Sequence, residues 1–262
     1  MMIDCHAHLG HEAFDADRDE VRRRAWRAGV ETVLVVGEDL EDDRHVARVC
    51  AEPCEDGARL VPCFGLHPDR FADDRDPPTR DEIDGVAALV REHAGDLAAI
   101  GEVGLDRWWV KDDARRRAQA EVLEELAALS VETGLPLNVH SRSAGHYTID
   151  LLLSAGAERV LMHAFDGKAS HAARAAEHGY VLSIPPSIVR SDQKKKLVRK
   201  LPLEALALES DSPVLGPERR ARNEPANLAL ARDVIAELHG ASADHVEEQT
   251  TANARRLFPS LA

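Results

Sequence analysis

Short runs of consecutive apolar residues alternate along the chain with segments in which apolar residues recur about every 3.6 positions. Uninterrupted apolar runs are typical of strands buried on both faces, as in a parallel sheet covered by helices. The predicted strands span residues 2–5, 32–36, 60–64, 98–103, 137–140, 160–163, 180–184 and 205–208. The predicted helices span residues 18–28, 40–50, 82–93, 113–133, 147–155, 168–178, 192–200 and 226–238.

Eight strand-then-helix units in a chain of 262 residues predict a single (β/α)8 TIM barrel, a fold of roughly 250 residues. A doubly wound open sheet is the alternative, because alternation alone does not reveal whether the sheet closes. Residues 242–258 predict one additional C-terminal helix. No long linker rich in Pro, Gly or Ser interrupts the pattern, so we expect one domain over residues 1–262.

Composition and charge narrow the location and the partners. No apolar run approaches the roughly 20 residues that a membrane span needs, and the N-terminal residues do not resemble a secretion signal. We therefore expect a cytoplasmic protein with no membrane contact, and no obligate protein partner is evident. The net charge of −14 argues against holding nucleic acid by bulk electrostatics, but it is compatible with an enzyme whose pocket is locally basic.

Imidazole and carboxylate side chains fall at the ends of the predicted strands. Asp4, His6 and His8 alternate along and just past the first strand, so we expect them to project to the same side. The carboxyl ends of the strands form the face on which TIM barrels build active sites. Six such side chains should meet there, namely His6, His8, Glu102, His140, His163 and Asp211.

These six groups predict a metal centre. Neutral imidazole and carboxylate bind zinc, manganese and related ions, and buried charges are costly unless they are paired or metal-bound. Six ligands are more than one tetrahedral ion needs, so we expect two divalent ions, which could be zinc, magnesium or manganese. No lysine lies within a predicted strand to serve as a carboxylated bridge, which leaves Glu102 as the candidate bridging ligand. Two ions can lower the pKa of a shared water for hydrolysis.

The same residues lie in motifs that resemble those of the TatD family of metal-dependent deoxyribonucleases, within the amidohydrolase-like barrels. The motifs occur in family order and extend nearly from end to end of the chain; each is weak alone, and together they are highly specific. They are Asp4-Cys5-His6-Ala7-His8, Gly65-Leu66-His67-Pro68, Gly101-Glu102-Val103-Gly104-Leu105-Asp106, residues 135–142, His163-Ala164-Phe165-Asp166-Gly167, Glu209-Ser210-Asp211-Ser212-Pro213, Arg222-Asn223-Glu224-Pro225 and Thr251-Ala252-Asn253.

The resemblance implies a role for each candidate residue. One metal ion would be held by His6, His8, Glu102 and Asp211. The other would be held by Glu102, His140 and His163. Asp211 would also orient or deprotonate the attacking water, and His67 would bind the substrate phosphate or act in catalysis.

Three segments differ from the family pattern, and the differences bear on the shape of the substrate. The family more often has Cys-Phe-Ser-Gly after the histidine of strand six, where this chain has Ala164-Phe165-Asp166-Gly167. Residues 183–187, at the end of strand seven, replace a stretch that bears Gly, and the run Arg107-Trp108-Trp109 is unusual. These differences leave the ligands intact.

Arginines on the loops of the predicted catalytic face suggest an anionic substrate such as a phosphodiester. They are Arg107, Arg142, Arg219, Arg220 and Arg222. Trp108 and Trp109 could stack on a nucleobase. The predicted substrate contacts are therefore His67, Arg107, Trp108, Arg142 and Arg222. The run Lys194-Lys195-Lys196 is interpreted instead as a solvent-facing helix turn.

Three functions fit these features. The first is a metal-dependent nuclease that trims DNA ends. The second is a hydrolase of esters or amides, because some TatD-like proteins resemble D-aminoacyl-tRNA deacylases and two-metal chemistry serves either electrophile. The third is a non-catalytic, metal-bound scaffold, which is disfavoured because no ligand is missing.

Overall fold

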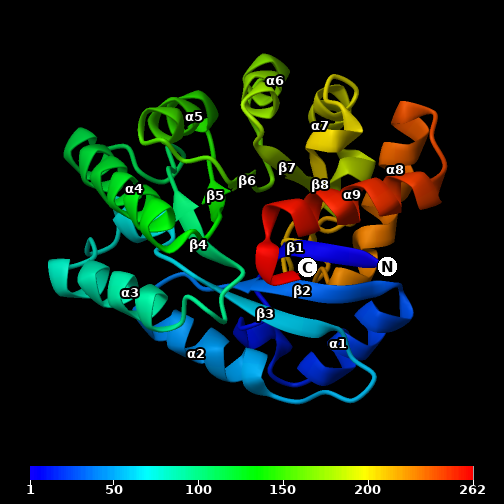
Figure 1. Ribbon diagram of the computed structural model, residues 1–262, viewed down its shortest axis with the longest axis horizontal. Helices are drawn as coiled ribbons and strands as arrows, with labels where there is room; N and C mark the ends of the chain where they lie inside the picture. Colours follow the sequence, from blue (N-terminus) through cyan, green and yellow to red (C-terminus); the bar gives the residue numbers. More distant parts are fainter. Residues whose placement is uncertain (262) are drawn as a thin grey trace.

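Eight parallel strands lie side by side in chain order and curve into a barrel whose outside is covered by helices (Figure 1). The computed structural model describes residues 1–261. The strands are β1 (Met2–Ala7), β2 (Val30–Val36), β3 (Arg59–Phe64), β4 (Ala99–Gly104), β5 (Leu137–His140), β6 (Val160–Met162), β7 (Val181–Ile184) and β8 (Leu206–Leu208).

Helices follow each strand, and one further helix ends the chain. The α-helices are α1 (Arg18–Arg27), α2 (Leu40–Ala51), α3 (Arg80–Glu92), α4 (Asp113–Thr133), α5 (Gly145–Ser154), α6 (Ala169–Glu177), α7 (Asp192–Val198), α8 (Leu228–His239) and α9 (Ala243–Leu257). Short 3-10 helices lie in the connections, namely η1 (Glu12–Phe14), η2 (Pro68–Phe71), η3 (Pro186–Arg190), η4 (Leu203–Ala205), η5 (Pro225–Asn227) and η6 (Pro259–Leu261).

The first and last strands meet and bring the sheet close to a closed barrel. The N–H of Asp211 donates to the carbonyl of His6 at 2.8 Å, and the N–H of His8 donates to the carbonyl of Ser212 at 2.8 Å. The predicted TIM barrel is therefore confirmed, as is the additional C-terminal helix, and the open-sheet alternative is wrong. In residues 1–261 no helix combines the length and the apolar character that crossing a membrane requires.

Two apolar clusters hold the barrel together. The larger one lies between the strands and the surrounding helices, as the continuous apolar strands predict. The smaller one fills the inside of the barrel with residues from alternate strand positions, such as Ile3, Val61 and Leu161. Leu257 and Phe258 at the end of α9 belong to this inner cluster, so α9 covers the amino-terminal end of the barrel (Figure 1). The carboxyl ends of the strands are left for the pocket.

Two strands contain an extra residue just where a candidate ligand stands. Between Asp4 and Ala7, β1 advances three residues while β2 advances two, and β4 gains one residue on β5 between Ile100 and Val103. An extra residue of this kind re-aims the side chains beside it, and such irregularities are frequent next to active sites. His6 lies in the first irregular segment and Glu102 in the second, and both reach the barrel mouth although strict alternation would not place them there.

Asn253 connects α9 to the beginning of β8. Its buried side-chain amide donates to the carbonyl of Leu203 at 2.7 Å and to that of Leu206 at 2.8 Å. This contact gives the Thr251-Ala252-Asn253 motif a structural explanation.

We predict that Asn253→Ala lowers the free energy of unfolding by about 2 kcal/mol, because two buried carbonyls lose their donor. Chemical denaturation measures the change, with Glu248→Ala on the exposed face of the same helix as control. Equal stability of the two variants would contradict this role of Asn253.

Candidate metal centre

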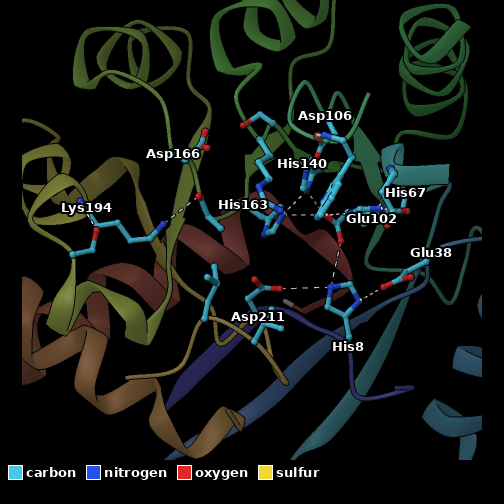
Figure 2. A pocket seen from close by; sticks show the side chains of 18 of the residues that line it. His8, Glu38, His67, Glu102, Asp106, His140, His163, Asp166, Lys194 and Asp211 are labelled. Atoms are coloured by element: carbon cyan, nitrogen blue, oxygen red, sulfur yellow. Dashed lines mark hydrogen bonds and ion pairs between the residues drawn. The ribbon is translucent and has the colours of Figure 1, made fainter. Parts of the chain in front are cut away.

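A pocket of about 590 Å³ opens at the carboxyl ends of the strands, and its floor is made of imidazole and carboxylate groups (Figure 2). The volume is in the range of typical small-molecule sites. The side chains of five of the six candidate ligands line it directly. They are His8, Glu102, His140, His163 and Asp211. His6 lies beneath them, fully buried.

Glu102 lies at the centre of this cluster, and its two carboxylate oxygens face different histidines. Oε2 is 3.3 Å from Nε2 of His6 and 3.4 Å from Nε2 of His8. Oε1 is 2.8 Å from Nδ1 of His140 and 2.9 Å from Nε2 of His163. The side chain is only 1% exposed, so its charge is almost wholly shielded from water. One carboxylate thus faces two separate sets of donors.

Three atoms of the first set have the spacing of one face of a tetrahedral metal site. Nε2 of His6 and Nε2 of His8 are 3.3 Å apart, and each is 3.6 Å from Oδ1 of Asp211. Such separations suit a metal ion at the usual zinc–nitrogen and zinc–oxygen distances of about 2.0–2.2 Å. Oε2 of Glu102 approaches the same two imidazole nitrogens.

The second set, on Oε1, consists of imidazoles. Nδ1 of His140 and Nε2 of His163 are 3.4 Å apart, and both are in hydrogen-bond range of Glu102. Nε2 of His67 is 3.2 Å from the same oxygen. The structure therefore brings all six predicted ligands and His67 together around Glu102, in overlapping groups of three.

Two of the imidazoles are oriented by hydrogen bonds on the nitrogen that faces away from Glu102. Nδ1 of His6 is 2.8 Å from the side-chain carbonyl of Asn138, whose amide donates to Cys5 at 2.9 Å. Nε2 of His140 is 2.9 Å from a carboxylate oxygen of Asp106. Outer partners of this kind fix the tautomer and ring orientation of metal-binding histidines.

The other three imidazoles also have a carboxylate on the outer side. Nδ1 of His8 lies 3.3 Å from Glu38, and Nδ1 of His163 lies 3.6 Å from Glu209. Nδ1 of His67 lies 2.8 Å from Asp69. All five imidazoles therefore turn one nitrogen toward the Glu102 carboxylate, and the other nitrogen of His8, His67 and His163 lies beside an outer carboxylate.

The imidazoles and carboxylates of this cluster shift one another's pKa values. Burial disfavours every charged form, but the neighbouring His67, His163 and His6 hold the pKa of Glu102 well below its ordinary value. Burial likewise opposes protonation of His163, yet Glu102 and Glu209 raise its pKa to about 10. Asp211 and Glu102 overcome burial and raise the pKa of His8 well above normal. The positive charge of His8 and His163 thereby compensates the negative charge of the buried carboxylates.

Asp211 is held in place by its own loop. It has a left-handed backbone (φ 53°), and Asn223 donates to the carbonyls of Ser210 at 2.7 Å and Val214 at 2.8 Å on either side of it. Burial raises its pKa, but the hydrogen bond to His8 and the nearby imidazoles hold the pKa below the ordinary value. Asp211 is therefore ionised at neutral pH and can act as a ligand or a base.

These residues fit a bound divalent metal ion. Oε2 of Glu102 is buried and has no hydrogen-bond partner among residues 1–261, although two imidazole nitrogens approach it. An orphaned, buried carboxylate oxygen among imidazole nitrogens is the arrangement that a cation satisfies.

The predicted substrate contacts divide into two groups. Arg142 lines the pocket, with its guanidinium 5.7 Å from the ring of Trp109, which also lines it. Trp108 lies outside the pocket lining and is 52% exposed. Arg107 is turned away and stacks on Tyr147. Asp106 fixes the backbone of both tryptophans, because its carboxylate accepts the backbone N–H of Trp108 at 2.6 Å and that of Trp109 at 2.7 Å.

Arg222 does not reach the pocket, contrary to the prediction from sequence. Its guanidinium pairs with Asp17 at 2.7 Å and donates to the carbonyl of Ala13. Arg24 joins Asp17 and Glu224 in the same network. The Arg222-Asn223-Glu224-Pro225 motif therefore links the segment after β8 to α1, and Asn223 within it fixes the loop that carries Asp211. Arg219 and Arg220 are exposed and also lie outside the pocket lining.

Two other predictions require correction. Asp4 does not join His6 and His8, because the irregular register of β1 breaks the alternation; its carboxylate accepts the N–H of Ser210 at 2.8 Å. Lys194 is not part of a solvent-facing turn, because its side chain is buried and lines the pocket, whereas Lys196 is exposed as expected.

Several residues around the site were not among those predicted from the sequence. Asp106, Asn138 and Glu209 lie inside the motifs quoted above, and their position two or four residues from a predicted ligand was the available signal. Glu38 and Asp69 follow directly on predicted strand ends or turns and offered a weaker signal.

Comparison with known proteins agrees with this geometry. Residues 3–259 match the profile of the family described as TatD related DNase. The human protein named Deoxyribonuclease TATDN3 is 41% identical over 99% of this chain and 95% of its own length. The metal-dependent hydrolase YabD of Bacillus subtilis is 33% identical over 98% of this chain and 99% of its own length. The solved structure of the Escherichia coli TatD homologue YjjV superimposes with a TM-score of 0.88, at 25% identity and 98% coverage of both chains.

We predict that metal binding expels protons from this site. His163, with a pKa of about 10, and His8, whose pKa is also raised, are protonated at neutral pH and must lose protons to bind a cation. Affinity for zinc or manganese should therefore increase as the pH rises from about 6 to about 9. Calorimetry in buffers of different ionisation enthalpy measures the release; a heat that is independent of the buffer would contradict it.

Proposed function

This chain belongs to the TatD family of metal-dependent hydrolases, and from that premise we propose that it is a deoxyribonuclease that cleaves phosphodiester bonds with water activated between two divalent ions. The observation that carries the proposal is the Glu102 carboxylate, which turns one oxygen to each of two donor sets at the floor of the pocket. A single shared carboxylate is a suitable bridge for paired cations.

The residues around the pocket favour an anionic, aromatic substrate. Arg142 contributes a guanidinium, whose planar donors suit phosphate oxygens, and Trp109 presents a half-exposed indole beside it. The human relative is itself named a deoxyribonuclease, which supports DNA as the substrate.

Asp211 is the group best placed to take the proton of the attacking water. It lines the pocket, it is ionised at neutral pH, and its loop is fixed by Asn223. Divalent ions held at this site would supply Lewis acidity, lowering the pKa of water and balancing charge on the phosphate oxygens. Glu102 itself is shielded from water, and its two oxygens would connect the two sets of donors.

His67 is suited to bind the substrate phosphate. Asp69 lies on its Nδ1 at 2.8 Å, and Nε2 faces the cluster at 3.2 Å from Glu102. Although burial opposes its protonation, Glu102 and Asp69 raise its pKa well above the ordinary value. A proton on Nε2 can therefore be donated to a non-bridging phosphate oxygen as negative charge develops there. A cytoplasmic location remains part of the proposal.

We predict that the metal-reconstituted protein cleaves 3′- and 5′-labelled single-stranded DNA, and that Glu102→Ala loses bound metal and all hydrolysis. Metal analysis and gel assays on the same samples measure both, with Glu92→Ala, on the exposed end of α3, as control. D-aminoacyl-tRNA is tested in parallel, because hydrolysis confined to that ester would favour the deacylase function. A Glu102→Ala protein that keeps its activity would remove the bridging role.

We predict a second effect at the pocket rim. Trp109→Ala and Trp108→Ala should lower kcat/KM for single-stranded DNA by roughly tenfold, because base stacking on an aromatic side chain contributes about 1–3 kcal/mol. The loss should be larger for Trp109, which lines the pocket. A small phosphodiester without a nucleobase is the matched substrate. Equal losses on both substrates would argue against stacking.

A further inference from the structure

A buried lysine lies on the wall of the pocket, apart from the metal-binding groups. Lys194 is in the first turns of α7, is 9% exposed, and lines the pocket together with Ser191 and Gln193. Figure 2 shows its side chain extending toward the pocket on the side of Asp166, away from His8 and Glu38. Its neighbours Lys195 and Lys196 are progressively more exposed, so the burial is specific to this position.

The ammonium group is incompletely satisfied by the protein. Within residues 1–261, the recorded partner of Nζ is the carbonyl oxygen of Ala164, at 3.2 Å. A lysine ammonium has three N–H donors, so two remain for a ligand or water. No ion pair within residues 1–261 joins Nζ to the Asp166 carboxylate, which accepts the backbone N–H of Ser143 at 3.2 and 3.3 Å. Burial lowers the pKa of Lys194, which reflects the cost of a cation without a directly paired anion.

Hydrogen bonds among buried residues fix the carbonyl group that Lys194 contacts. Ala164 has a left-handed backbone (φ 41°), and its N–H donates to the buried carboxylate of Glu209 at 2.9 Å. Glu209 is fixed in turn by the hydroxyl of Ser183 at 2.6 Å. The Ala164 carbonyl is thereby presented to Lys194, and the ammonium is held one residue beyond the ligand His163.

We propose that Lys194 binds a non-bridging oxygen of a phosphate that flanks the scissile bond. The proposal rests on the nuclease function, because a phosphate undergoing attack would lie over the cluster around Glu102, and the next phosphate of a strand would lie beside it. Lys194 is then a substrate-binding residue that discriminates polynucleotides from isolated phosphodiesters. An ammonium is a suitable partner for a phosphate oxygen.

The test compares two substrates and two variants. Lys194→Met keeps the aliphatic stem and removes the charge, and Lys196→Met removes an exposed charge from the same helix. Steady-state kinetics is measured on a single-stranded oligonucleotide and on bis(p-nitrophenyl) phosphate, which has one phosphate only. We expect Lys194→Met to lose about 10- to 100-fold in kcat/KM on the oligonucleotide, mainly through KM, and less than about twofold on the small diester.

A modified substrate provides a test on the unaltered protein. A neutral methylphosphonate next to the scissile bond should impair wild-type cleavage at that bond, and it should cause no further loss in Lys194→Met. The same methylphosphonate placed far along the strand should have little effect on either protein. Lys196→Met should behave as wild type with every substrate.

Different results would overturn the role of Lys194 and the nuclease function. Equal losses of Lys194→Met on both substrates, or no loss on the oligonucleotide, would overturn the flanking-phosphate assignment while leaving the nuclease function standing. Additive losses from the methylphosphonate and Lys194→Met would also overturn it. A wild-type protein that hydrolyses the small diester but no oligonucleotide would overturn the proposed function, and this inference with it.

Discussion

The site depends on one buried carboxylate that must be surrounded by positive charge. Glu102 is almost fully removed from water, and an isolated carboxylate in such surroundings would be strongly destabilising. The imidazoles of His8, His67 and His163, whose pKa values are raised, supply the compensation, and divalent ions would replace the protons of the imidazoles that bind them. The outer acceptors, such as Asn138 and Asp106, keep the neighbouring imidazoles turned inward. Metal binding and the ionisation of the site are therefore parts of one electrostatic arrangement.

The two ends of the barrel have different roles, one in stability and the other in function. At the amino-terminal end, α9 covers the inner apolar cluster and is fastened by Asn253. At the carboxyl end, polar groups are buried and backbones with positive φ occur at Asp211 and Ala164. Such conformations cost energy and persist where the surrounding structure determines them. The apolar core and α9 thus support a polar face that would not be stable alone.

Much of this arrangement could be predicted from the sequence, and the rest has identifiable physical reasons. Continuous apolar strands gave the barrel, and polar residues at the strand ends gave all six candidate ligands. The extra residues in β1 and β4 have no signature in the pattern, so the separation of Asp4 from His6 was not foreseen. The predicted positions of Lys194 and Arg222 were wrong because residues distant in the sequence hold these side chains. Lys194 donates to the carbonyl of Ala164, and Arg222 pairs with Asp17.

The most direct measurement of the central claim is diffraction from zinc-reconstituted crystals at energies on either side of the zinc absorption edge. We predict two anomalous peaks, one beside each carboxylate oxygen of Glu102. The first should lie among His6, His8 and Asp211, and the second beside His140 and His163. A single peak, or peaks that Glu102 does not contact, would contradict the bridging arrangement.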